Sequence, residues 1–289
     1  MIAGLEMYHK LMRFPDWKDK AMTLSYDDAV IYDERLIQIM QKYGLKGTFN
    51  VNGGCFARNA RRMDEETAVR LYQNSGMEVA MHGFKHLTLT ACNNAEIMNE
   101  FYQDKVELEK LFGVVMRGGA YAFGAYNDES VRVLQSLGVS YFRTVKSTHS
   151  FDIPTDWLQL NPTCHHKDNI MELLAEFVGE TEKRIPFQSK IEKRKAKLFY
   201  MFGHSFEFND DNNWELIEGF GAKVAEYDDI WHATNSEIYD YVKAYDNLIF
   251  TAKGDKVLNL SPIDVYLWID GQNVLAKANA TTAIDLDCV

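Results

Sequence analysis

Residues 21–51 read AMTLSYDDAVIYDERLIQIMQKYGLKGTFNV, and this stretch carries one complete strand, helix and strand unit. Ala21–Ser25 is an apolar run that predicts a strand, and Thr48–Val51 predicts a second one. Between them, Asp33–Tyr43 gathers its apolar side chains on one side of a helix, which Gly44 ends. A helix that connects two buried strands is typical of a parallel sheet.

The same unit repeats along the chain. Further strands are expected at Glu78–Met81, Gly119–Ala122, Tyr141–Val145, Leu198–Phe202 and Ile230–His232. Further helices are expected near Asp64–Asn74, Asn94–Phe112, Asp128–Leu137, Trp214–Glu226 and Asn235–Tyr245. About seven β/α units in alternation predict an α/β fold, a distorted (β/α)7-type barrel. A doubly wound open sheet is the alternative.

The C-terminal part of the chain departs from this alternation. Val265–Ile269 and Asn273–Lys277 flank Asp270-Gly271, a dipeptide that favours a tight hairpin turn. We therefore expect a short antiparallel β extension that packs on the same domain as the barrel. The expected division is an N-terminal segment at 1–20, the barrel at 21–248 and the C-terminal β extension at 249–289.

Composition restricts the partners of this chain. Its 289 residues are 46% hydrophobic, which is enough for a large core, and their formal net charge is −11. That balance leaves no basic surface able to neutralise a run of phosphates, so nucleic acid is excluded as a partner. No window approaches about 18 consecutive apolar residues, so we expect no membrane association.

The compartment is expected to be the cytoplasm. Residues 1–20 carry charges throughout and lack the apolar stretch of a signal peptide. The four cysteines are scattered without a C-x-x-C spacing, which favours reduced thiols. An exported form with a trimmed leader is the alternative.

Two adjacent carboxylates, Asp27 and Asp28, follow the first strand. In a parallel β/α fold, the carboxyl end of a strand opens onto the functional face. Neighbouring side chains of a strand point to opposite sides, so a turn must begin there before both can face one site. A metal could hold one carboxylate ionised while the other accepts a proton. The structural alternative is that an aspartate caps the following helix.

A pair of histidines, His82 and His86, follows the strand that ends at Met81. Histidines at positions i and i+4 can converge on one cation if the stretch is helical, and neutral imidazoles suit zinc and its first-row neighbours. Together with Asp28 they complete a set of two histidines and one carboxylate, which leaves coordination positions open for water and substrate. Alone, either histidine could be an ordinary structural residue.

These motifs resemble those of the polysaccharide deacetylase family, the family 4 carbohydrate esterases. Leu24–Ala29 resembles the family's T-F-D-D-G motif, and His82–His86 resembles its H-x-x-x-H motif. The resemblance implies a distorted β/α barrel that binds a divalent cation and removes acetyl groups from carbohydrates. The expected cation is zinc, with cobalt, nickel or manganese as alternatives. By position, the resemblance makes Asp27 the general base and Asp28 a metal ligand.

The third family motif is present in a variant form. Ala120–Asn127 resembles R-x-P-Y-G followed by an aromatic residue and Asn, but Ala120 stands in place of the arginine. In the common form that arginine keeps the catalytic aspartate ionised. Arg143 is predicted to take its place, because a buried carboxylate needs a cationic partner to stay charged, and Arg117 is the alternative. The Phe123 backbone amide corresponds to the family's oxyanion donor, with a simple turn as the structural alternative.

The last motif contains the predicted acid. Gly203-His204-Ser205 resembles the family's final L-x-H motif, in which the histidine protonates the leaving group. An imidazole suits this role because its pKa lies near working pH. The expected substrate contacts are Tyr126, Trp157, His165 and His166. Core packing is the alternative for Trp157, and a second metal site is the alternative for the two histidines.

Together these residues predict a metal-dependent hydrolase that removes an N- or O-linked acetyl group from a carbohydrate. Its expected partner is an acetylated carbohydrate or a small amide. One alternative is a hydrolase of a non-sugar or cyclic amide that uses the same metal site. The other is a non-catalytic sugar-binding relative, which the missing third-motif arginine motivates.

Overall fold

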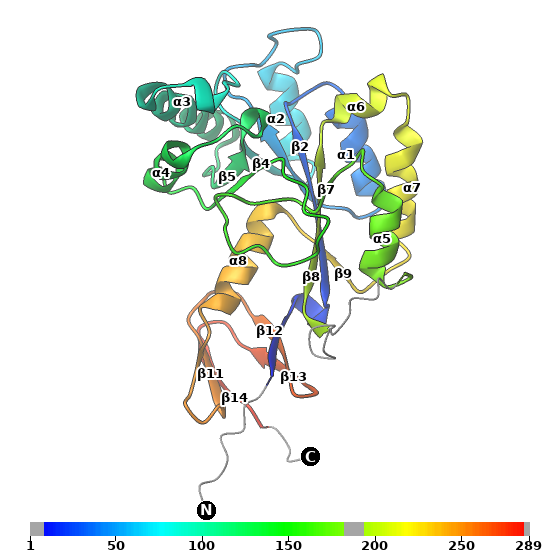
Figure 1. The fold of residues 1–289 in the computed structure, drawn as a ribbon, viewed down its shortest axis with the longest axis vertical. Helices are drawn as coiled ribbons and strands as arrows, with labels where there is room; N and C mark the ends of the chain where they lie inside the picture. The colour runs from blue at the N-terminus through cyan, green and yellow to red at the C-terminus, as the bar shows by residue number, and fades with distance from the viewer. Residues whose placement is uncertain (1–8, 182–193, 286–289) are drawn as a thin grey trace, which may run out of the picture.

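Parallel strands form the central sheet of the computed structural model, which describes residues 9–181 and 194–285. They are β2 (Lys20–Asp27), β3 (Gly47–Val51), β4 (Glu78–Met81), β5 (Gly118–Ala120), β6 (Tyr141–Arg143), β7 (Cys164–His165), β8 (Lys197–Gly203) and β9 (Ile230–His232). The order is β6-β5-β4-β3-β2-β8-β7, and β9 pairs with the first part of β2. The sheet curls into a half-barrel, so the predicted distorted barrel is confirmed (Figure 1).

Helices cover the outside of this sheet (Figure 1). They are α1 (Asp33–Lys42), α2 (Glu65–Gln73), α3 (Asn94–Phe112), α4 (Asp128–Ser136), α5 (Ile170–Val178), α6 (Ser205–Asp210), α7 (Trp214–Val224) and α8 (Asn235–Asp246). Three 3-10 turns lie at Pro15–Trp17, Leu89–Ala91 and Ala122–Gly124. All six predicted helices are present, and α5 and α6 were not predicted. Within the described ranges, no helix has both the length and the apolar character needed to cross a bilayer.

The central strand β2 separates an apolar layer from a polar one. Side chains alternate along a strand, and Met22, Leu24 and Tyr26 join the main hydrophobic cluster that the outer helices cover. The alternate residues are polar and equally buried: Thr23 donates to Asn235, and Ser25 accepts from Arg143. The polar face therefore runs along the inside of the barrel towards the end of β2.

Antiparallel strands form the extension, as predicted. They are β10 (Ile249–Phe250), β11 (Lys256–Asn259), β12 (Val265–Ile269), β13 (Gln272–Ala276) and β14 (Ala280–Ala283). Asp270 and Gly271 connect β12 to β13, which confirms the predicted hairpin. The structure adds β1 (Lys10–Arg13), which pairs with β12 and so joins the N-terminal segment to the extension. Figure 1 shows the extension below the barrel, at the end where β2 begins.

The three-part division of the chain remains a prediction, and residues 1–8 and 286–289 of its outer parts lie outside the described residues. Cys55, Cys92 and Cys164 are free thiols, whereas Cys288 lies outside the described residues.

Candidate metal centre and its acid and base

Asp27 and Asp28 lie where β2 ends. Asp27 is the last residue of the strand and is buried, and Asp28 follows it with a φ of 93°, in the left-handed region. The backbone thus turns at Asp28, as the sequence required for both carboxylates to face one site. Neither aspartate caps α1, because the residue at the N-cap of that helix is Tyr32. The helix-cap alternative is therefore wrong.

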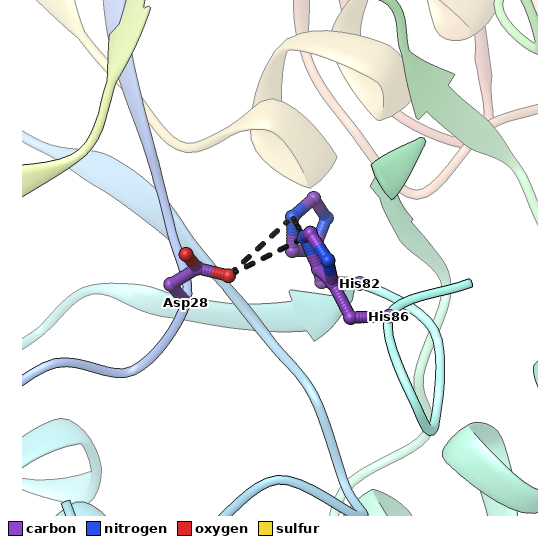
Figure 2. Close-up of side chains that lie close together, drawn as sticks. All are labelled: Asp28, His82 and His86. Carbon is purple, nitrogen blue, oxygen red and sulfur yellow. Dashed lines mark hydrogen bonds and ion pairs between the residues drawn. The ribbon is translucent and has the colours of Figure 1, made fainter. Parts of the chain in front are cut away.

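Three side chains converge beside this turn. The Nε2 atoms of His82 and His86 are 3.2 Å apart, and they lie 3.8 and 3.6 Å from Asp28 Oδ1 (Figure 2). The two histidines follow β4 on a loop, not on a helix. Gly83 and His86 have φ values of 83° and 61°, and these left-handed residues bend the loop so that both rings face Asp28.

The spacing of these three atoms fits a divalent metal ion. Nitrogen and oxygen ligands about 2.1 Å from a tetrahedral zinc lie about 3.4 Å from one another. The Nδ1 atom of His82 is 2.8 Å from the carbonyl oxygen of Ala120, which leaves Nε2 with the lone pair that a metal requires. Burial, followed by the charge of His82, lowers the pKa of His86 to about 4, so its ring is neutral near pH 7.

Two carboxylates of α3 hold the histidine loop. Asp104 is fully buried and accepts hydrogen bonds from the backbone amides of His82, Gly83 and Gly53, at 3.0, 2.7 and 2.7 Å. Glu100 accepts from the amides of Lys85 and Leu87. The loop is therefore anchored along its length, because buried amides that lost these acceptors would each cost about 1–3 kcal/mol.

The predicted partner of Asp27 is in place. Arg143 Nη2 lies 2.6 and 2.5 Å from the two carboxylate oxygens of Asp27, and Asn50 donates to Oδ1 at 2.8 Å. Burial acts to raise the pKa of Asp27, but the Arg143 guanidinium and the nearby His82 and His204 outweigh it and hold the pKa well below its usual range. Arg117 instead pairs with Asp240. Of the two arginines, the geometry thus selects Arg143.

His204 lies immediately before α6, where Glu207 holds it. The His204 ring atom Nδ1 is 3.2 Å from Glu207 Oε2, which also accepts from the His204 backbone amide at 2.9 Å. Burial acts to lower the pKa of His204, but the bond to Glu207 and then the charges of Asp27 and Asp28 outweigh it and raise the pKa. These contacts therefore favour the protonated form of the His204 imidazole.

A second group, formed by His165, His204 and Glu207, also has metal-like spacing. His165 Nε2 is 3.2 Å from Glu207 Oε2, and the Lys167 backbone amide donates to His165 Nδ1 at 3.1 Å. Because Nδ1 accepts, the proton of a neutral His165 sits on Nε2, and that atom has no lone pair for a metal. We interpret this group as a carboxylate that binds two imidazoles.

The remaining predicted residues lie in different surroundings. Phe123 has a φ of 58°, and its exposed ring packs edge-on against His86 with centroids 4.4 Å apart. Tyr126 stacks on Tyr121 and bonds to Gln159. His166 is buried, and its ring stacks on Phe208. Trp157 is also buried and packs against Tyr239.

Besides Asn50, Glu100 and Asp104, three further contacting residues were not predicted. Arg62 bonds to Asp28, Asn52 bonds to Arg62, and Glu207 bonds to His204. Glu207 had a signal, because a glutamate three residues after a helix cap is typical of a capping box. Arg62 and Asn52 lie in a segment without a periodic pattern, and nothing in their spacing indicated contact with Asp28.

The first half of the chain matches a known family. Residues 15–142 match the family model described as polysaccharide deacetylase. The matched region contains the predicted metal ligands, Asp27 and Phe123. It ends directly before Arg143, and His204 lies well beyond it. No curated protein matches the chain in sequence.

Solved structures of such proteins share the fold. A proposed polysaccharide deacetylase from Mycobacterium smegmatis is 19% identical with a TM-score of 0.61, over 82% of this chain and 94% of that one. The peptidoglycan deacetylase PdaC from Bacillus subtilis, as a mutant, is 14% identical with a TM-score of 0.51, over 78% and 93%. A family 4 carbohydrate esterase pseudoenzyme from Bacillus anthracis is 15% identical with a TM-score of 0.51, over 79% and 68%. Identities this low show a common fold only.

Replacing Arg143 should raise the pKa of Asp27. In Arg143→Met the buried carboxylate loses its cation, and we expect the protein to lose about 3–5 kcal/mol of stability at neutral pH. Arg143→Lys keeps the charge and should keep the pKa of Asp27 nearer its original depressed value. Carboxyl-carbon NMR titration reads the pKa, and urea denaturation reads the stability. An unchanged Asp27 titration in Arg143→Met would contradict the assignment.

Proposed function

We propose that this chain, whose residues 15–142 belong to the polysaccharide deacetylase family, is a metal-dependent hydrolase that removes acetyl groups from a carbohydrate. The observation that carries the proposal is the convergence of Asp28, His82 and His86 beside a second, separately held carboxylate, Asp27. An N-linked or O-linked acetyl group is equally compatible with this arrangement.

The divalent metal ion that this spacing fits would bind to Asp28, His82 and His86. Zinc is the ion we propose, because two imidazoles and one carboxylate with open positions form a common catalytic zinc set. A divalent ion held by these three side chains would supply Lewis acid chemistry to the acetyl carbonyl and to the attacking water.

Asp27 is the proposed general base. Its Oδ2 atom lies 3.8 Å from His82 Nε2, so a water beside the metal ligands is within its reach. The ion pair with Arg143 keeps the carboxylate ionised at neutral pH and holds it in one orientation. Asp27 would take the proton of the water as its oxygen attacks the acetyl carbon.

His204 is the proposed general acid. Because its Nδ1 atom faces Glu207, the opposite ring nitrogen Nε2 is the one that would donate to the departing nitrogen or oxygen. The Phe123 backbone amide is the proposed donor to the developing oxyanion, and the contact of the Phe123 ring with His86 supports this role. Acetate and the deacetylated sugar are the products.

The test is acetate release together with metal content. We expect the protein to release acetate from one or more of chitooligosaccharides, acetylated xylan and small N-acetyl sugars, with one divalent ion per chain. His82→Ala should lose the ion and lower the rate by about 100-fold or more, since Lewis acid catalysis is worth several kcal/mol. His9→Ala is the matched control, because His9 pairs with Asp270 in the extension.

The other possible outcomes of this test would indicate a different function. Hydrolysis of a cyclic amide without acetate release would favour the alternative substrate class. A bound ion without any turnover would favour the non-catalytic relative. Full acetate release by metal-free protein would contradict the proposed mechanism.

Glu207→Gln should narrow the pH range of activity. The acid must be protonated, so the rate falls as pH rises through the pKa of His204, which Glu207 helps to raise. The variant should move the alkaline limb of kcat to lower pH and lose more activity at pH 8 than at pH 6. Asp211→Asn is the control, because Asp211 pairs with Lys167 and not with His204. An equal loss at every pH would argue against this role.

A further inference from the structure

We infer that Arg62 and Asn52 are positioning residues that fix the distance between the two loops of the metal centre. The inference rests on the proposed function only in requiring that the Asp28, His82 and His86 cluster binds a metal. Arg62 and Asn52 lie between β3 and α2, on a third loop that supplies no metal ligand. Their contacts join the loop of Asp28 to the loop of His82.

Arg62 binds Asp28 at two points. Its Nη2 atom is 2.8 Å from Asp28 Oδ1, and its Nη1 atom donates to the Asp28 backbone carbonyl. Both side chains are largely buried, with 13% and 14% of their surfaces exposed. Asp28 Oδ1 is also the atom that faces both histidines. An oxygen with two lone pairs can accept from Arg62 on one side and ligate a metal on the other.

The backbone of Asp28 needs such support. Its φ of 93° lies in a region that residues other than glycine rarely adopt, at a cost of about 1–3 kcal/mol. The bond from Arg62 to the Asp28 carbonyl holds this conformation, and the bond to the carboxylate sets the direction of the side chain. A flat guanidinium can make both bonds at once, whereas a lysine has a single ammonium.

Asn52 carries the connection to the second loop. Its side-chain oxygen accepts from Arg62 Nη1 at 2.7 Å, and its side-chain nitrogen donates to the carbonyls of His82 and Gly83 at 2.7 and 2.8 Å. Asn52 is fully buried. One unbroken chain of hydrogen bonds therefore runs from Asp28 through Arg62 and Asn52 to the backbone of His82.

A positioning role and a purely electrostatic role of Arg62 predict opposite changes in metal affinity when Arg62 is replaced. A cation next to Asp28 opposes the arrival of a second cation, so a charge without a positioning role would weaken metal binding, and its removal would strengthen it. If Arg62 instead holds Asp28 at the correct distance from the histidines, its removal should weaken metal binding despite the lost positive charge.

The experiment measures Zn²⁺ and Co²⁺ affinity of the full chain by competition with a chromophoric chelator. We expect Arg62→Met and Arg62→Lys each to weaken binding by about 10–100-fold, the usual effect of removing a partner of a metal ligand. Arg62→Lys keeps the charge, so a loss in this variant isolates the geometry of the guanidinium. Arg61→Met is the control, because it removes the same charge from the same loop while Arg61 pairs with Asp210.

Equal or tighter metal binding in Arg62→Met would overturn the inference. A variant whose circular dichroism spectrum matches that of the wild type is folded, so its loss of metal affinity is a local effect. If Arg62→Met does not fold, the metal affinity of Arg62→Lys decides the inference. Wild-type protein that binds no ion would overturn the proposed function as well. Wild-type binding with unchanged affinity in both Arg62 variants would overturn the inference alone.

Discussion

The site depends on two adjacent carboxylates, each held by its own arginine. Asp27 and Asp28 follow one another at the end of β2, where like charges in a buried place repel. Arg143, from β6, binds Asp27, whereas Arg62, from the loop after β3, binds Asp28. Neighbouring side chains therefore have different surroundings: Asp27 is held by Arg143 beside His82, and Asp28 faces both histidines.

The barrel supplies these partners because parallel strands end at one face. The ends of β2, β4 and β6 contribute the carboxylates, the histidines and Arg143. His204 lies between the end of β8 and the start of α6. The β extension lies at the opposite end of β2 (Figure 1). The extension therefore lies away from the candidate metal centre.

The sequence predicted those features that depend on local patterns of residues. The features that it did not predict were missed for physical reasons. Alternating apolar strands and helices predicted the barrel, and motif order predicted that Asp28 and His82 meet. The prediction for Arg143 came from the need of a buried carboxylate for a cation, not from spacing. Arg62 was missed because its contact with Asp28 depends on how a loop without periodicity folds back. Short elements such as α6 were missed because six residues are too few to show a helical period.

Anomalous diffraction at the zinc absorption edge, from crystals of the full chain grown with one equivalent of zinc, tests the central claim most directly. We predict one strong peak about 2.0–2.2 Å from Asp28 Oδ1 and from the Nε2 atoms of His82 and His86. A peak bounded by other residues, or no peak while these side chains keep their positions, would contradict it.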